Sequence, residues 1–76
     1  MNIKKLGNNM TVLDLNVMEV FFSYETPVGA MLDDGSLVRT DEFFSVTTSK
    51  HINKWLAGRE AREVSQEFID DLVEVK

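Results

Sequence analysis

The sequence predicts an α+β fold: a small antiparallel sheet of three to five strands, built from hairpins, followed by two short C-terminal helices packed on one face. Three observations support this class. Apolar and polar residues alternate over residues 17–24, which is the period of a strand. Residues 33–36 (DDGS) separate two apolar segments, and Asp-Gly is a strong hairpin signal. After residue 48, apolar residues recur every three or four positions, as in a helix.

The predicted sheet begins with a hairpin of residues 11–15 and 17–24 that turns near Asn16, after an earlier turn at residues 7–9. Along residues 17–24, one face carries Met18, Val20, Phe22 and Tyr24, and the other carries Glu19, Phe21 and Ser23. A second hairpin joins residues 28–32 to 37–40 and places Leu32 opposite Leu37 and Met31 opposite Val38. Residues 42–47 are expected to continue as a further strand.

Two helices follow in the prediction. The first spans Ser49 to Ala57, with Thr48 or Ser49 as its N-cap and Gly58 just past its end. Its apolar side carries Ile52, Trp55 and Leu56, its opposite side Lys50 and Lys54, and His51 lies at the border. The second helix starts at its N-cap Ser65 and carries an apolar stripe of Phe68, Ile69, Leu72 and Val73. Its acidic face consists of Glu67, Asp70, Asp71 and Glu74.

Length and composition indicate one small domain over residues 1–76 that needs neither metal nor cofactor. The chain has no Cys and one His, so neither a disulfide nor a zinc site of ordinary ligands is expected. A domain this small is marginally stable alone, which favours a homodimer or a bound partner. The chain has no apolar run of signal-peptide or membrane-span length, so we expect a soluble, cytoplasmic protein that does not bind membranes.

The charges are unevenly distributed along the chain. The net charge is −5, yet residues 49–62 carry four cations against one acid, a local charge of +3. These cations are Lys50, Lys54, Arg59 and Arg62. An acidic partner could meet this segment, and so could an acidic segment of a second copy. Binding of nucleic acid through residues 50–62 is the alternative, although four cations are few for phosphate-driven affinity.

Catalysis and metal binding are not predicted. The chain has no nucleophile elbow, no phosphate-binding glycine loop and no calcium-loop spacing. His51 near a Ser or Thr could form a nucleophile–base pair, but packing beside Trp55 is the better interpretation. The hydroxyls of Thr48 and Ser49, with nearby lysines, could form an anion site at a helix N-terminus, or they could simply cap the helix.

Three strings carry a resemblance to a known group of proteins. They are FSYETPVGA at residues 22–30, SVTTSKHINKWL at residues 45–56 and EVSQEFIDDL at residues 63–72. Together they resemble a family of short uncharacterised proteins of tailed bacteriophages, especially phages of marine bacteria and cyanobacteria. The resemblance implies a virus-encoded protein that acts in the bacterial cytoplasm, and it implies no activity and no functional residues.

The sequence therefore favours a non-enzymatic interaction protein that binds a host or phage macromolecule and modulates or inhibits it. The predicted contact residues are Lys50, His51, Lys54 and Arg59, with Thr48 and Ser49 assisting and Arg62 nearby. Two alternatives stay open: a nucleic-acid-binding protein, and a small ligand binder or enzyme with His51 inside an apolar pocket. The acidic face of the second helix could equally be a solvated surface or an interface.

Overall fold

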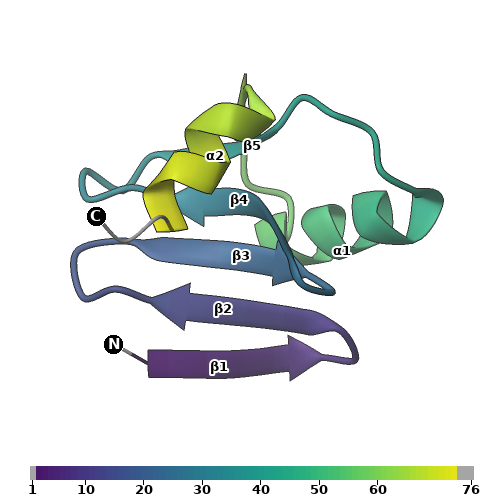
Figure 1. The fold of residues 1–76 in the computed structure, drawn as a ribbon, viewed down its shortest axis with the longest axis horizontal. Coiled ribbons are helices and arrows are strands. Elements are labelled where there is room, and N and C mark those ends of the chain that lie inside the picture. Colours follow the sequence, from purple (N-terminus) through teal and green to yellow (C-terminus); the bar gives the residue numbers. More distant parts are fainter. Residues whose placement is uncertain (1, 74–76) are drawn as a thin grey trace.

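The fold is a six-stranded sheet with two helices, as described for residues 2–73 by a computed structural model (Figure 1). The spatial order of the strands is β1-β2-β3-β4-β5-β6, the same as their order in the chain. The elements are β1 (Asn2–Gly7), β2 (Met10–Asp14), β3 (Glu19–Ser23), β4 (Thr26–Met31), β5 (Leu37–Thr40), α1 (Val46–Leu56), β6 (Arg62–Val64) and α2 (Gln66–Val73). The α+β class is confirmed, but the sheet is mixed rather than wholly antiparallel, because β5 and β6 pair in parallel, and it has six strands rather than three to five.

The two strands that sequence analysis missed lie at the two edges. β1 pairs with β2 in antiparallel fashion across the turn at Asn8–Asn9, where Asn9 adopts a left-handed φ of 62°. β6 pairs in parallel with β5, and α1 forms the crossover between these two strands. A three-residue strand has no measurable alternation, and a parallel pairing has no turn signal, so neither feature marks β6 in the sequence.

The β4–β5 hairpin has a register one residue away from the predicted one. Met31 lies opposite Leu37 and Ala30 opposite Val38, so the predicted pairs Leu32–Leu37 and Met31–Val38 are wrong. The reason is a three-residue loop that ends with Gly35 in the left-handed region, at φ 88°. The Leu32 N–H donates to the Ser36 carbonyl at 2.8 Å, which closes the loop over residues 33–35, one residue shorter than the predicted loop of residues 33–36.

The segment after β5 also differs from the prediction. Residues 42–47 do not form a strand, and Phe43 is 73% exposed. α1 instead begins at Val46 with Ser45 as its N-cap, because the Ser45 Oγ accepts the Thr48 N–H at 3.0 Å. Thr48 therefore lies inside the first turn and is not the cap, and neither is Ser49. α1 ends at Leu56, one residue before the predicted end at Ala57. Ala57 and Gly58 both have positive φ, as is common just past a helix end.

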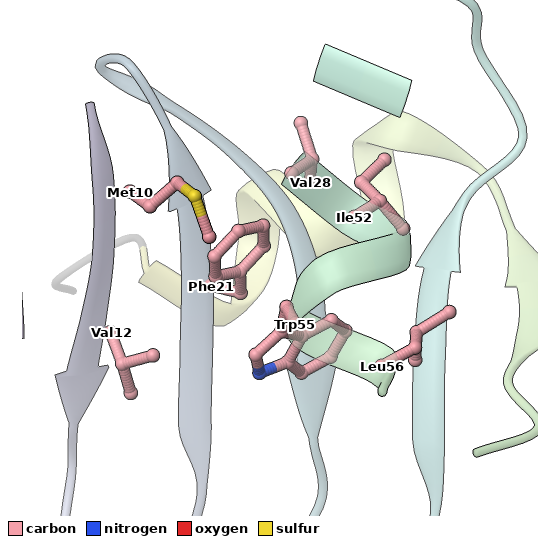
Figure 2. Packing of buried hydrophobic residues seen from close by; sticks show 7 residues of the cluster. All are labelled: Met10, Val12, Phe21, Val28, Ile52, Trp55 and Leu56. Atoms are coloured by element: carbon pink, nitrogen blue, oxygen red, sulfur yellow. The ribbon is translucent and has the colours of Figure 1, made fainter. Parts of the chain in front are cut away.

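The helices lie on opposite faces of the sheet, whereas the sequence prediction placed both on one face. Ile52, Trp55 and Leu56 of α1 pack with Phe21 of β3 and its neighbours on one face (Figure 2). Leu72 and Val73 of α2 pack against Val20, Ala30 and Val38 on the other face. Successive strand residues point to opposite faces, so the fully buried pair Val20 and Phe21 shows that both faces of β3 are covered.

α2 begins as the sequence predicts. Ser65 is its N-cap, because the Ser65 Oγ accepts the Phe68 N–H at 3.1 Å, and Ile69 is fully buried. Glu67, Asp70 and Asp71 are exposed, while Glu74 lies outside the described residues. In residues 2–73, no helix has the length and apolar character needed to cross a bilayer.

The contact that holds α1 on the sheet depends on a glycine. The Trp55 ring stacks on Phe21 with ring centroids 5.0 Å apart and an interplanar angle of 3°. Gly29 of β4 lies beneath the same indole, where a Cβ would be 2.5 Å from Trp55 Cζ3 and 3.1 Å from the Val38 carbonyl oxygen. The indole occupies space that any other residue at position 29 would take.

We expect the substitution Gly29→Ala to lower the free energy of unfolding by about 1–3 kcal/mol, because the new methyl group overpacks the core. Urea unfolding followed by far-UV circular dichroism measures this change. In a Trp55→Phe background the benzo ring is absent and the methyl group has room, so Gly29→Ala should cost less there. An equal cost in both backgrounds would contradict the assigned contact.

Candidate functional site

The candidate site is the outer face of α1. Lys50 and Lys54 are separated by one helical turn and point away from the buried side formed by Ile52, Trp55 and Leu56. His51 lies beside them and is partly buried. A shallow hollow of about 610 Å³ on this face is lined by Thr47, Lys50, His51, Asn53 and Lys54. Three of the predicted contact residues are therefore brought together, and Thr47 and Asn53 join them.

A series of hydrogen-bonded hydroxyl groups contacts His51 on the side of α1 that faces the sheet. His51 Nδ1 lies 2.7 Å from the Oγ of Ser23, which is at the end of β3 and buried. Ser23 Oγ lies 3.2 Å from Thr48 Oγ1, which in turn lies 3.2 Å from Ser45 Oγ. Each of these polar groups therefore finds a partner within the network, as buried polar groups require.

Ser23 Oγ and His51 Nδ1 are as close as a catalytic nucleophile and its base. Their surroundings, however, are not those of an active site. Ser23 is only 2% exposed, so its Oγ faces the network rather than a substrate. The described hydrogen bonds of this network involve hydroxyl groups and the imidazole, with no carboxylate to orient the His. The arrangement fixes the imidazole in place and satisfies a buried serine.

Tyr24 borders the site from the β3–β4 turn. Its ring centroid is 5.6 Å from that of His51, with an interplanar angle of 45°. Its backbone is left-handed, with φ 58°, and its N–H donates to the Asn9 carbonyl at 2.7 Å. A bulky residue is uncommon in this conformation, which usually favours glycine or asparagine. Half of the Tyr24 side chain remains exposed.

The other predicted contact residues lie elsewhere or are engaged. Thr48 is buried in the hydroxyl network, and Ser49 is partly buried in the first turn of α1. Arg59 folds back on the end of α1 and donates to the carbonyls of Leu56 at 2.8 Å and Trp55 at 2.7 Å. Arg62 lies on β6 and lines a separate hollow of about 550 Å³ with Arg39, Glu60 and Glu63. The four cations of residues 50–62 therefore do not form one patch.

Comparison with known proteins places the chain in a family. Residues 1–71 match the model of a family of unknown function, DUF8033. The chain belongs to the DUF8033 family. No curated protein and no solved structure matches it. Membership therefore supports the prediction of an uncharacterised family and supplies no activity.

The carboxylate of Asp34 in this DUF8033 member has a structural partner in a turn. Asp34 accepts the Ser36 N–H at 2.9 Å, and hydrogen bonds from the Ser36 side chain and backbone lower the pKa of Asp34. This carboxylate belongs to the β4–β5 loop, where Asp is expected. Within residues 2–73, no three His, Asp or Glu side chains gather in a way that could hold a metal ion.

The predicted contact residues did not include four residues that belong to or border the candidate site: Ser23, Tyr24, Thr47 and Asn53. A signal existed for Ser23, because alternation places it on the same face as the buried Phe21, where a hydroxyl needs a partner. No local signal identifies that partner, since Thr48 and His51 are 25 and 28 residues away. Tyr24 was assigned to a strand rather than to a turn.

We expect Ser23→Ala to lower the free energy of unfolding by about 1–3 kcal/mol, because the buried Thr48 hydroxyl and His51 lose their shared partner. Thermal or urea unfolding measures the change. Thr47→Ala is the matched control on the exposed side of α1, with an expected effect within about 0.5 kcal/mol. Equal effects of the two substitutions would show that the network does not stabilise the fold.

Proposed function

We propose that this protein is a non-enzymatic interaction protein that binds an acidic surface of another protein through the outer face of α1. The observation that carries the proposal is the hollow lined by Thr47, Lys50, His51, Asn53 and Lys54. It contains two lysines and no carboxylate, on a chain whose net charge is −5. Charge complementarity of this kind speeds encounter and selects the partner.

The proposed setting is the cytoplasm of a bacterium infected by a tailed phage. What supports it is the resemblance of residues 22–30, 45–56 and 63–72 to short phage proteins. The partner is then a host or phage protein, and the consequence of binding is to redirect or inhibit it. A small, rigid α1 face that covers an acidic patch on a larger protein suits such a role, because occlusion needs no chemistry.

A homodimer is a second possible partnership for so small a chain. The basic face of α1 and the acidic face of α2 lie on opposite sides of the sheet. A contact between α1 of one copy and α2 of the next is therefore head-to-tail and leaves a free face at each end. Such a contact does not close into a two-fold dimer, which favours a different protein as the partner of α1.

We expect Lys50→Glu/Lys54→Glu to abolish capture of the partner, because the reversed charges repel an acidic surface. Tagged protein is incubated with lysate of phage-infected bacteria, and retained proteins are quantified by mass spectrometry. The control Lys4→Glu/Lys5→Glu makes the same change in net charge on the exposed strand β1. A partner retained equally by wild type and by both variants would show that α1 is not the contact surface.

Nucleic-acid binding through residues 50–62 is the alternative proposal. The separation of Arg59 and Arg62 from Lys50 and Lys54 weighs against it, since few phosphates can be neutralised in one contact. We expect no gel shift of single- or double-stranded DNA or RNA even at low salt. A shift that disappears steeply as salt rises, and that Lys50→Glu/Lys54→Glu removes, would favour the alternative.

A further inference from the structure

The free edge of β1 is the longer of the two edges of the sheet. β1 pairs with β2 on one side only, and all six of its residues are exposed. It lies at the rim of the sheet, away from both helices (Figure 1). The opposite edge, β6, has three residues, of which Arg62 and Glu63 are charged. Short, charged edges resist pairing with another chain, whereas a six-residue edge offers a row of backbone N–H and C=O groups to a further strand.

An unbroken apolar row on the α2 side of the sheet ends at this edge. Cross-strand pairing places one residue from each of five neighbouring strands side by side: Val38, Ala30, Val20, Leu13 and Ile3. Burial decreases toward the edge, because the first three are fully buried beneath α2, Leu13 is partly buried and Ile3 is 70% exposed. Ile3 is therefore the member of the row whose outer side has no neighbouring strand.

Two-fold symmetry limits how two β1 edges can pair. A two-fold axis perpendicular to the sheet makes the strands antiparallel and keeps each face on its own side, so the residue at the axis lies opposite its own copy. An axis at Lys4 or at Lys5 places two lysines opposite each other, which is unfavourable. An axis at Ile3 avoids both lysine pairs, and an axis at Asn2 pairs a shorter stretch of strand. The lysines of β1 therefore select the register centred on Ile3.

The register centred on Ile3 is favourable on both faces of the sheet. On the α2 side, Ile3 meets Ile3 of the second copy, and the apolar row continues into that copy. On the α1 side, Lys4 of the second copy lies opposite Asn2, whose row continues through Asp14 and Glu19. Asp14 is two strands from that lysine, about 10 Å between Cα atoms, which the lysine side chain can span. An exposed ion pair contributes little, but its sign favours the same register.

We propose that two copies of this chain pair through β1 in antiparallel fashion, with Ile3 at the two-fold axis, and join their six-stranded sheets into one. The contact is isologous, so it closes and removes the exposed edge of β1 from both copies. It covers the last apolar residue of the row and pairs backbone groups that the single chain leaves to water. The strand contact is short, so we expect a weak dimer that dissociates in the micromolar range.

This dimer goes beyond the proposed function and leaves the surface of that function free. Lys50 and Lys54 are exposed on α1, which packs on the sheet away from β1. Because the axis is perpendicular to the sheet, both α1 helices lie on the same side of the joined sheet. The dimer therefore presents two basic α1 faces in the same direction.

Sedimentation equilibrium from about 5 µM to about 1 mM protein tests the dimer. We expect the mean mass of the wild type to rise from 8.7 kDa toward twice this value. Ile3→Glu should weaken association by at least about tenfold, because two carboxylates then face each other at the axis. Val46→Glu is the matched control, since Val46 is 63% exposed and lies on α1, and it should leave association unchanged.

Ile3 is exposed, so Ile3→Glu should keep the wild-type far-UV circular dichroism spectrum, and its effect on mass then reports association. A wild-type mass that stays at 8.7 kDa up to about 1 mM protein would overturn the proposal. Equal weakening by Ile3→Glu and Val46→Glu would overturn it as well.

Single cysteines locate the axis, since the chain has no native Cys. Opposite residues of an antiparallel pair have Cα atoms about 4.5–5.5 Å apart, within the range of a disulfide. We expect Ile3→Cys to form a disulfide-linked dimer under mild oxidation. Lys4→Cys should link much more slowly, because its copy is a diagonal neighbour at about 7–8 Å. Faster linking of Lys4→Cys, or equal rates for Ile3→Cys and the control Val46→Cys, would overturn the assigned register.

The dimer and the proposed function fail separately. Lys50→Glu/Lys54→Glu should dimerise as the wild type does while losing the captured partner, and Ile3→Glu should keep the partner while losing the dimer. Loss of dimerisation in Lys50→Glu/Lys54→Glu would show that α1, rather than β1, is the contact between copies. If the wild type is monomeric and its capture of a partner depends on Lys50 and Lys54, the proposed function stands and this inference is wrong.

Discussion

The stacking of Trp55 on Phe21 is the contact on which the rest of the structure depends. It fastens α1 to the middle of the sheet, where Phe21 is fully buried and Gly29 leaves room for the indole. Because the helix is held by one side, its opposite side is presented to solvent in a fixed orientation. The positions of Lys50, His51 and Lys54 therefore follow from an apolar contact that none of them makes.

A second contact, which is polar, fixes the orientation of His51 on the helix that the Trp55–Phe21 stacking holds in place. The hydroxyl network from Ser45 to Ser23 connects the N-cap of α1 to the end of β3 and terminates at His51. The network caps the helix, because Ser45 Oγ accepts the Thr48 N–H. It also fixes the imidazole of His51, through Ser23 Oγ. Sites whose residues are held by a supporting shell of this kind bind with less loss of conformational freedom.

The sheet also separates the charges of the molecule. Basic side chains gather on the exposed side of α1 and carboxylates on the exposed side of α2, with the sheet between them. A chain with net charge −5 can therefore offer a positive face to one partner while its remaining surface repels other acidic proteins. The opposite placement of the helices, rather than composition alone, makes this polarity possible.

The sequence by itself determined the α+β class, the central strands, the cap at Ser65 and the apolar side of α1. Each of these depends on residues that are near one another in the chain, where spacing and cap chemistry are sufficient. Only the tertiary structure decided the parallel pairing of β6, the opposite faces taken by the two helices and the contact of His51 with Ser23. These features join residues that are far apart in the chain, and their energies come from packing and hydrogen bonds that exist only once the sheet and α1 have met. The same reason explains the outcome for the predicted site. Helical spacing was sufficient to bring Lys50, His51 and Lys54 together. Arg59 and Arg62 lie apart from them, past the end of α1 and on strand β6, which local patterns did not reveal.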